Sequence, residues 1–152
     1  MTKLNELYDE QGQSPWLDNL RRDYLTEEKL QKLVDQGIRG VTSNPTIFAK
    51  AIEGGDFYDE QFDKLLEKHP VSECYWEMVI TDIVDALAVL RPVHDESDGV
   101  DGYVSLEVAP SLAHDTEGTE KSARALHERI HRPNLFVKIP ATAEGVPAIR
   151  TM

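Results

Sequence analysis

The sequence predicts an α/β protein built on a parallel β-sheet. Four short apolar segments alternate along the chain with segments whose apolar residues recur at helical spacing. Strands that alternate with helices in this way are joined by crossovers and therefore form a parallel sheet. Each candidate strand also ends near a polar residue, at the end where parallel α/β proteins bind their ligands.

The first strand follows a short amphipathic helix. We expect that helix over residues 4–11, ended by Gly12, and the strand over residues 14–18. The helix that follows is expected to begin at Thr26, which is a favourable N-cap residue, and to end at Gly37.

The second strand is predicted over residues 38–43. Asn44 and the proline after it open the next helix, since asparagine is a good N-cap and proline suits the first helical position. A glycine pair at 54–55 interrupts the helical pattern, which resumes over residues 56–69.

The longest helix is expected to begin at Ser72, with an apolar face broad enough to cover a sheet. That face consists of Tyr75, Trp76, Val79, Ile80, Ile83, Val84, Leu87 and Leu90. Residues 91–102 are polar, acidic and contain glycine, so this stretch is expected to be a loop.

The third and fourth units complete the chain. We expect strand three over residues 103–108, a helix over residues 119–132 that Pro133 stops, and strand four from Leu135. Residues 142–152 then begin a fourth return helix.

Composition limits the possible functions. The chain has 152 residues and a formal net charge of −12, so we expect no nucleic-acid partner. No apolar run approaches the ~18–20 residues of a transmembrane helix and the start lacks a signal-peptide core, so we expect no membrane association and a cytoplasmic location. The single cysteine, Cys74, precludes an internal disulfide and is expected in the core.

Lys138 is the one charged residue within the apolar segment 135–139. Burial disfavours the charged form of a lysine and so favours the neutral amine, which attacks carbonyl carbons. The pattern therefore indicates a nucleophile that forms a Schiff base with a carbonyl substrate. The alternative is that Lys138 lies on an edge strand with its ammonium group in water.

Polar residues near the four strand ends are Asp18, Asn44, Glu107 and Lys138. Side chains alternate between the two faces of a strand, which places Ser105 on the same face as Glu107. We therefore expect these groups to converge at one mouth, with Lys138, Asp18, Glu107 and Asn44 as candidate catalytic residues. Asn44 and Ser105 are the candidates for substrate binding.

Each of the three partners of Lys138 also has a structural interpretation. Asn44 is a good helix cap without any catalytic role. Asp18 could pair with Arg21 or Arg22, and Glu107 with a buried polar neighbour.

A zinc site is a competing hypothesis. Residues 127–131 match the H-E-x-x-H motif, in which His127 and His131 would bind zinc and Glu128 would activate water. The helix that carries them is expected to turn its polar side away from the strand ends. Few downstream residues remain to supply a third ligand, and Glu144 is the best of them. We therefore expect no metal site, and a zinc hydrolase is only a remote alternative.

The chain resembles the transaldolase family, in particular one bacterial branch. The resemblance rests on residues 42–48 (TSNPTIF), 104–108 (VSLEV) and 137–142 (VKIPAT), together with the Trp-Leu-Asp sequence at 16–18. The combination of the Asn-Pro and lysine motifs is specific, and together the motifs span nearly the whole chain.

The resemblance implies a function and a fold. In the family the lysine that matches Lys138 forms the Schiff base, and the residues that match Asp18, Asn44 and Glu107 surround it. The implied reaction transfers a dihydroxyacetone unit from sedoheptulose 7-phosphate or fructose 6-phosphate to an aldose phosphate, in the pentose phosphate pathway. No cofactor is implied, and the implied partners are sugar phosphates.

The fold implied is a (β/α)8 TIM barrel, which takes about 250 residues. The chain supplies about four strand-helix units, so we expect residues 1–152 to be the amino-terminal half of one class I aldolase-type barrel domain, truncated after strand four. Open sheet edges would favour self-association, and we expect little activity from this chain alone. Two alternative functions are a fructose 6-phosphate aldolase-like lyase and a non-catalytic half-barrel.

Overall fold

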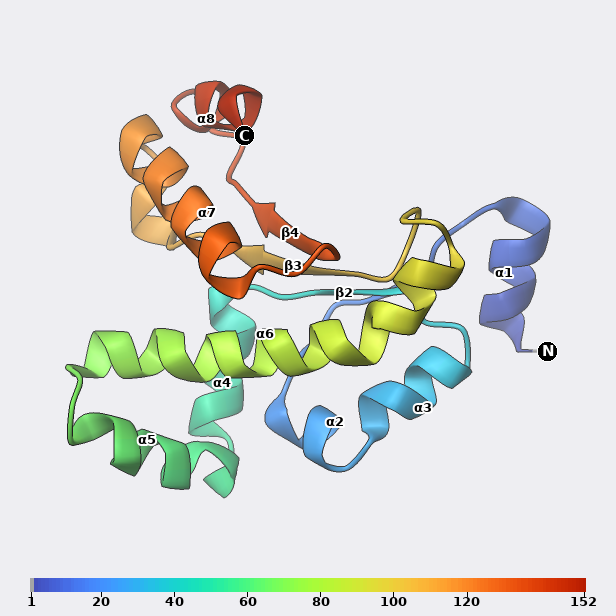
Figure 1. Cartoon of the computed structure of the whole chain (residues 1–152), viewed down its shortest axis with the longest axis horizontal. Helices are drawn as coiled ribbons and strands as arrows, with labels where there is room; N and C mark the ends of the chain where they lie inside the picture. The colour runs from blue at the N-terminus through green and yellow to red at the C-terminus, as the bar shows by residue number, and fades with distance from the viewer. Residues whose placement is uncertain (1) are drawn as a thin grey trace.

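The computed structural model describes residues 2–152 and contains one parallel sheet. Its strands are β1 (Trp16–Leu17), β2 (Gly40–Thr42), β3 (Tyr103–Glu107) and β4 (Leu135–Lys138). They lie in the order β1-β2-β3-β4, and all three neighbouring pairs are parallel (Figure 1). A doubly wound sheet reverses its strand order, whereas a (β/α) barrel does not. The predicted α/β class is confirmed, and the strand order is that of part of a (β/α)8 barrel.

Helices and short 3-10 turns precede, connect and follow the strands. They are α1 (Lys3–Gln11), α2 (Arg22–Thr26), α3 (Lys29–Asp35), α4 (Pro45–Glu53), η1 (Asp56–Tyr58), α5 (Asp59–Leu66), α6 (Val71–Glu96), η2 (Pro110–Leu112), α7 (Thr116–Ile130) and α8 (Gly145–Thr151). Figure 1 shows α6 and α7 lying along the sheet, α4 running from the end of β2 past α6, and α5 beside the amino-terminal half of α6.

The core lies between α6 and one face of the sheet. Ile83, Leu87 and Leu90 of α6 belong to the same buried cluster as Val104 and Leu106 of β3. Burying each such side chain contributes about 1.5–3 kcal/mol. The predicted apolar face of the long helix is confirmed, and Cys74 is buried in the same helix, as expected.

The cap predictions for α1 and α4 are confirmed. Gly12 ends α1 in the left-handed conformation, with φ of 62°. The side chain of Asn44 accepts a hydrogen bond from the backbone N–H of Ile47, 3.0 Å away, and so caps α4.

The predicted start of the second helix at Thr26 is wrong. Thr26 is the last residue of α2, and its hydroxyl donates to the carbonyl oxygen of Arg22. A separate helix, α3, begins at Lys29 after Glu28 adopts a left-handed conformation. The reason is in part tertiary, because Arg22 pairs with Asp82 of α6. The local pair between Asp23 and Lys29 also helps to order α2 ahead of α3.

The predicted loop over residues 91–102 is wrong in its first half. Helix α6 continues through Pro92 to Glu96. Proline removes one helical hydrogen bond, but the carbonyl left without a donor belongs to Ala88, an exposed residue that water can reach. An ion pair between Arg91 and Asp95, 2.7 Å apart, also supports this last part of the helix.

Other boundaries differ by a few residues. Helix α7 begins at Thr116 rather than at residue 119, because Asp115 accepts a hydrogen bond from the N–H of Gly118 and caps it. Strands β1 and β2 are shorter than predicted. None of the helices within residues 2–152 has the length and apolarity required to cross a bilayer.

Candidate active site

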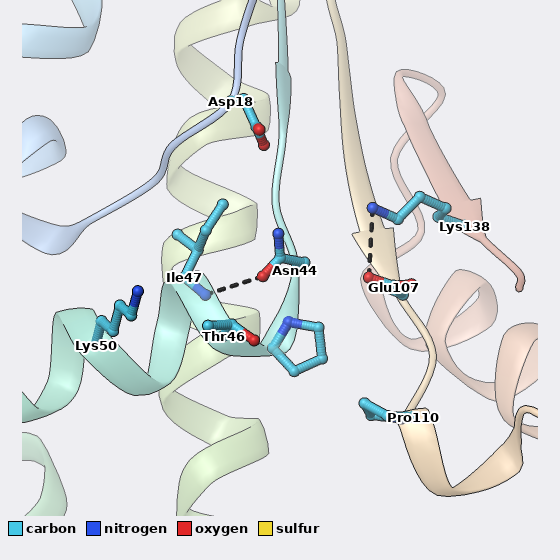
Figure 2. Close-up of a pocket in the computed structure, with 9 residues that line it drawn as sticks. Asp18, Asn44, Thr46, Ile47, Lys50, Glu107, Pro110 and Lys138 are labelled. Atoms are coloured by element: carbon cyan, nitrogen blue, oxygen red, sulfur yellow. Dashed lines mark hydrogen bonds and ion pairs between the residues drawn. The ribbon is translucent and has the colours of Figure 1, made fainter.

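A cavity of about 480 Å³ lies at the carboxyl ends of the strands. Figure 2 shows its lining residues, which come from the ends of the strands, from the first turns of α4 and, for Pro110, from η2. The lining consists of Asp18, Asn44, Pro45, Thr46, Ile47, Lys50, Glu107, Pro110 and Lys138. The structure therefore brings together the four residues that the strand-end argument selected.

Lys138 and Glu107 are neighbours across the β3–β4 pair. The strand register places them side by side, and their Nζ and Oε2 atoms lie 3.3 Å apart (Figure 2). The Lys138 ammonium group also donates to the carbonyl oxygen of Ser43 at 3.4 Å. Both contacts are long, so the lysine is oriented toward the cavity without being firmly held.

The expected burial of Lys138 is wrong for this chain. Its side chain is 41% exposed, and that of Glu107 is 22% exposed. The helices cover the opposite face of the sheet, so the face that carries Lys138 is open to solvent. The structure therefore supports the alternative interpretation, in which Lys138 lies on an edge strand with its ammonium group reachable by water.

Asn44 combines a structural role with a position in the cavity. Its side-chain oxygen accepts the hydrogen bond from Ile47 that caps α4. Figure 2 shows its amide nitrogen pointing away from that helix. The capping interpretation is therefore correct, and it leaves the amide N–H groups able to donate to a ligand.

Asp18 does not form the ion pairs that its structural interpretation required. Arg21 pairs with Asp23 at 3.0 Å, and Arg22 pairs with Asp82 at 2.8 Å. Within the described part of the chain Asp18 has no ion-pair partner, and it is exposed at the cavity. Its carboxylate can therefore accept a proton or a hydrogen bond from a ligand.

Ser105 is not brought to the cavity. It lies on the same strand as Glu107 but is only 7% exposed, and it does not line the cavity. Its carbonyl oxygen accepts hydrogen bonds from the backbone and the hydroxyl of Ser43. The residue thus contributes to the pairing of β2 with β3.

Two polar cavity residues, Thr46 and Lys50, were not predicted as site residues from the sequence. Thr46 and Lys50 are four residues apart on α4, which places them on one helix face. That face lines the cavity because Asn44 fixes the start of the helix at the strand end. The spacing from Asn44 was a usable signal, but a surface lysine on a helix is too common to single out.

The competing zinc motif is not assembled. His127, Glu128 and His131 are all exposed, and His131 has left the helix in a left-handed conformation with φ of 48°. Glu144 pairs instead with His114, 3.0 Å away. Across residues 2–152, no group of three or more His, Cys, Asp or Glu residues could hold a metal ion.

These features define a class of protein. Parallel strands in chain order, with a lysine and carboxylates gathered at their carboxyl ends, are typical of the (β/α)-barrel enzymes. The chain belongs to the transaldolase/fructose-6-phosphate aldolase family, whose family model matches residues 15–152.

Curated relatives support this assignment. The chain is 46% identical to "Transaldolase 2" of Nostoc punctiforme over 91% of its own length and 37% of the relative's. It is 49% identical to a transaldolase of Thiobacillus denitrificans over 93% of the chain and 40% of the relative. It is also 51% identical to a transaldolase of Acidothermus cellulolyticus, over 91% and 38%. The chain thus spans 37–40% of the length of these relatives.

Proposed function

We propose that residues 1–152 form the amino-terminal part of a class I aldolase-type barrel that acts as a transaldolase. One observation carries the proposal: Lys138 lies 3.3 Å from Glu107 in a cavity that Asp18 and Asn44 also line. The reaction would transfer a dihydroxyacetone unit from a ketose phosphate to an aldose phosphate.

The first step is formation of a Schiff base. The neutral amine of Lys138 adds to the ketone carbon, and loss of water from the carbinolamine gives an iminium. Glu107 is close enough to take a proton from the ammonium group and to pass a proton to the departing hydroxyl, directly or through a water. The amide of Asn44 would donate a hydrogen bond to the carbinolamine or to a substrate hydroxyl.

The second step breaks a carbon–carbon bond. Asp18 takes the proton of the substrate hydroxyl, the iminium accepts the bonding electron pair, and an aldose phosphate leaves. The dihydroxyacetone unit remains on Lys138 as an enamine, which then attacks the carbonyl of an acceptor aldose phosphate. The proton on Asp18 returns to the new hydroxyl, and hydrolysis frees Lys138. This scheme needs no metal and no organic cofactor.

A lyase is the second candidate, because the matching family includes fructose-6-phosphate aldolases as well as transaldolases. A lyase would release the dihydroxyacetone unit to water instead of transferring it. Acceptor-dependent product formation by an extended chain separates the two. A non-catalytic half-barrel would form no covalent adduct.

The test is borohydride reduction in the presence of dihydroxyacetone or fructose 6-phosphate, followed by peptide mass mapping. We expect one adduct, on Lys138, and none in Lys138→Met. Lys121→Met is the matched control, because Lys121 is an exposed lysine on α7 outside the cavity, and it should keep the adduct. An adduct spread over surface lysines would contradict the proposal.

We also propose that this chain self-associates in solution through its open sheet edges. Strands β1 and β4 each have one unpaired edge in the four-stranded sheet, and such edges pair with other chains. We expect self-association and little or no transaldolase turnover by the 152-residue chain. A monomer in light scattering at low concentration, or full turnover, would contradict this. A cytoplasmic location and the lack of nucleic-acid or membrane partners complete the proposal and rest on composition.

A further inference from the structure

Three aromatic rings lie together on the sheet face that carries Lys138, and we call Trp16, Tyr103 and Phe136 the aromatic stack. The ring of Phe136 stacks on that of Tyr103 with centroids 3.9 Å apart and an angle of 7° between the ring planes. It also lies nearly parallel to the indole of Trp16, at 6.5 Å and 11°. The ring of Phe136 is therefore nearly parallel to both of the other rings.

The aromatic stack joins the two edge strands. Trp16 belongs to β1 and Phe136 to β4, and β2 and β3 separate these strands in the sheet. No backbone pairing links β1 to β4, so the contact between Trp16 and Phe136 is made by side chains across the open face.

Gly40 allows Trp16 to reach across the sheet. It is the register partner of Trp16 on β2, and a Cβ at this position would lie 2.3 Å from Cε2 of the indole. A side chain at residue 40 would therefore push the ring off β2. The lack of a side chain at Gly40 gives the indole of Trp16 room over β2. The ring of Phe136 then packs beside the indole.

Each end of the aromatic stack lies two residues before a cavity residue on the same strand. Trp16 precedes Asp18, and Phe136 precedes Lys138 on the same face of β4. Strand β1 has only two residues paired with β2, so its backbone ladder alone holds Asp18 weakly. Lys138 and Glu107, by contrast, are fixed by the direct register of β3 and β4.

We propose that Trp16 and Phe136 are positioning residues that set the placement of Asp18 relative to Lys138 across the cavity. This inference rests on the proposed function, in which carbon–carbon cleavage uses both groups. Schiff-base formation uses Lys138 and Glu107, so it does not depend on the aromatic stack. Disturbing the stack should therefore separate the two steps.

The test measures the placement directly. Spin labels are attached at Asp18→Cys and Lys138→Cys in a Cys74→Ala background, and their dipolar broadening is recorded. We expect Phe136→Leu and Gly40→Ala to change the broadening, and Phe136→Tyr to preserve it because the ring remains. Phe57→Leu is the control, since Phe57 is an exposed aromatic residue in η1 and outside the stack.

A second label pair distinguishes positioning from general loss of structure. Labels at Glu107→Cys and Lys138→Cys should keep their broadening in every variant. An unchanged signal from the 18/138 pair in both Phe136→Leu and Gly40→Ala would overturn the inference. Equal disturbance of both pairs would overturn it too, because the stack would then only support the fold.

Borohydride trapping with dihydroxyacetone supplies the functional control in chains that carry no labels. Phe136→Leu should keep adduct formation on Lys138 within about twofold of the unsubstituted chain. Loss of the adduct in Phe136→Leu, with the adduct still formed in the unsubstituted chain, would contradict the positioning role. A lack of adduct in the unsubstituted chain would contradict the proposed function instead, and the label distances would still decide the inference.

Discussion

Two ion pairs in this molecule have similar components and different environments. The Arg22–Asp82 pair is 2.8 Å long, with side chains 12% and 0% exposed. The Lys138–Glu107 pair is 3.3 Å long, with side chains 41% and 22% exposed. The first links α2 to α6 and the second lines the cavity, so the comparison shows how the fold treats a structural charge and a candidate reactive one.

Further hydrogen bonds stabilise the buried pair. The Tyr58 hydroxyl donates to Asp82 at 2.7 Å, and Arg22 also donates to the carbonyl oxygen of Met78. Burial, offset in part by Tyr58 and Arg22, raises the pKa of Asp82 above its usual value. Burial and the neighbouring Asp82 carboxylate likewise raise the pKa of Tyr58 well above its usual value. These groups hold η1, α2 and α6 together.

The Lys138–Glu107 pair is held by few other contacts, as expected for a group that must react with a ligand. Among residues 2–152, the polar contacts of the Lys138 ammonium group are two long ones, to Glu107 and to the carbonyl oxygen of Ser43. A ligand can replace such contacts at low cost, since exposed pairs contribute about 0–1 kcal/mol. The difference teaches that a short, buried ion pair marks a structural element here, whereas a long, open pair marks the candidate site.

The largest effect on stability should come from breaking the buried pair. Asp82→Asn leaves the Arg22 charge buried without a counter-charge, which typically costs about 3–5 kcal/mol of unfolding free energy. The measurement is urea unfolding followed by circular dichroism. A loss below about 1 kcal/mol would show that the pair behaves as an exposed one.

An intermediate effect on stability is expected from Asp23→Asn. The Asp23 side chain is 6% exposed, and it pairs with Lys29 at 2.7 Å and with Arg21 at 3.0 Å. Burial alone would raise the pKa of Asp23, but the hydrogen bonds and charges of Lys29 and Arg21 outweigh it and lower that pKa.

A lowered carboxyl pKa means that the folded state binds fewer protons than the unfolded state. The stabilisation is therefore complete above the unfolded pKa of about 3.9 and is lost as the pH falls through the lower folded value. Urea midpoints measured below about pH 4 should fall less steeply with acid in Asp23→Asn than in the parent chain. Parallel curves for the two proteins would contradict this.

The smallest effect on stability should come from Glu107→Gln. Because the pair with Lys138 is open to solvent, we expect a loss within about 1 kcal/mol. The same change should slow borohydride trapping at Lys138 by about 100-fold or more, since it removes the carboxylate that exchanges protons with the amine. A large stability loss with unchanged trapping would reverse the comparison between the two pairs.

The sequence predicted the order and type of the strands and main helices because these depend on local patterns. The apolar face of α6 and the caps at Gly12 and Asn44 involve residues within a few positions of each other. The predicted helix start at Thr26 and the predicted helix end before Arg91 were wrong for the opposite reason. Both depend on what surrounds the residue in space, either distant ion pairs or access of water to a carbonyl oxygen.

The members of the site could be predicted because parallel strands end at one edge of the sheet. This rule selected Asp18, Asn44, Glu107 and Lys138, which line one cavity. Side-chain alternation added Ser105, which the structure buries outside the cavity lining. Alternation gives the face of a strand but not the depth at which a side chain lies.

The sequence by itself determined the parallel α/β class, the family resemblance and the residues at the strand ends. Hydrophobic periodicity and short motifs encode these properties locally. Only the tertiary structure decided that Lys138 is open to solvent, that Arg22 pairs with Asp82 and not with Asp18, and that Phe136 stacks with Trp16. Exposure and pairing between distant residues depend on how the sheet and its helices pack, which no local pattern specifies.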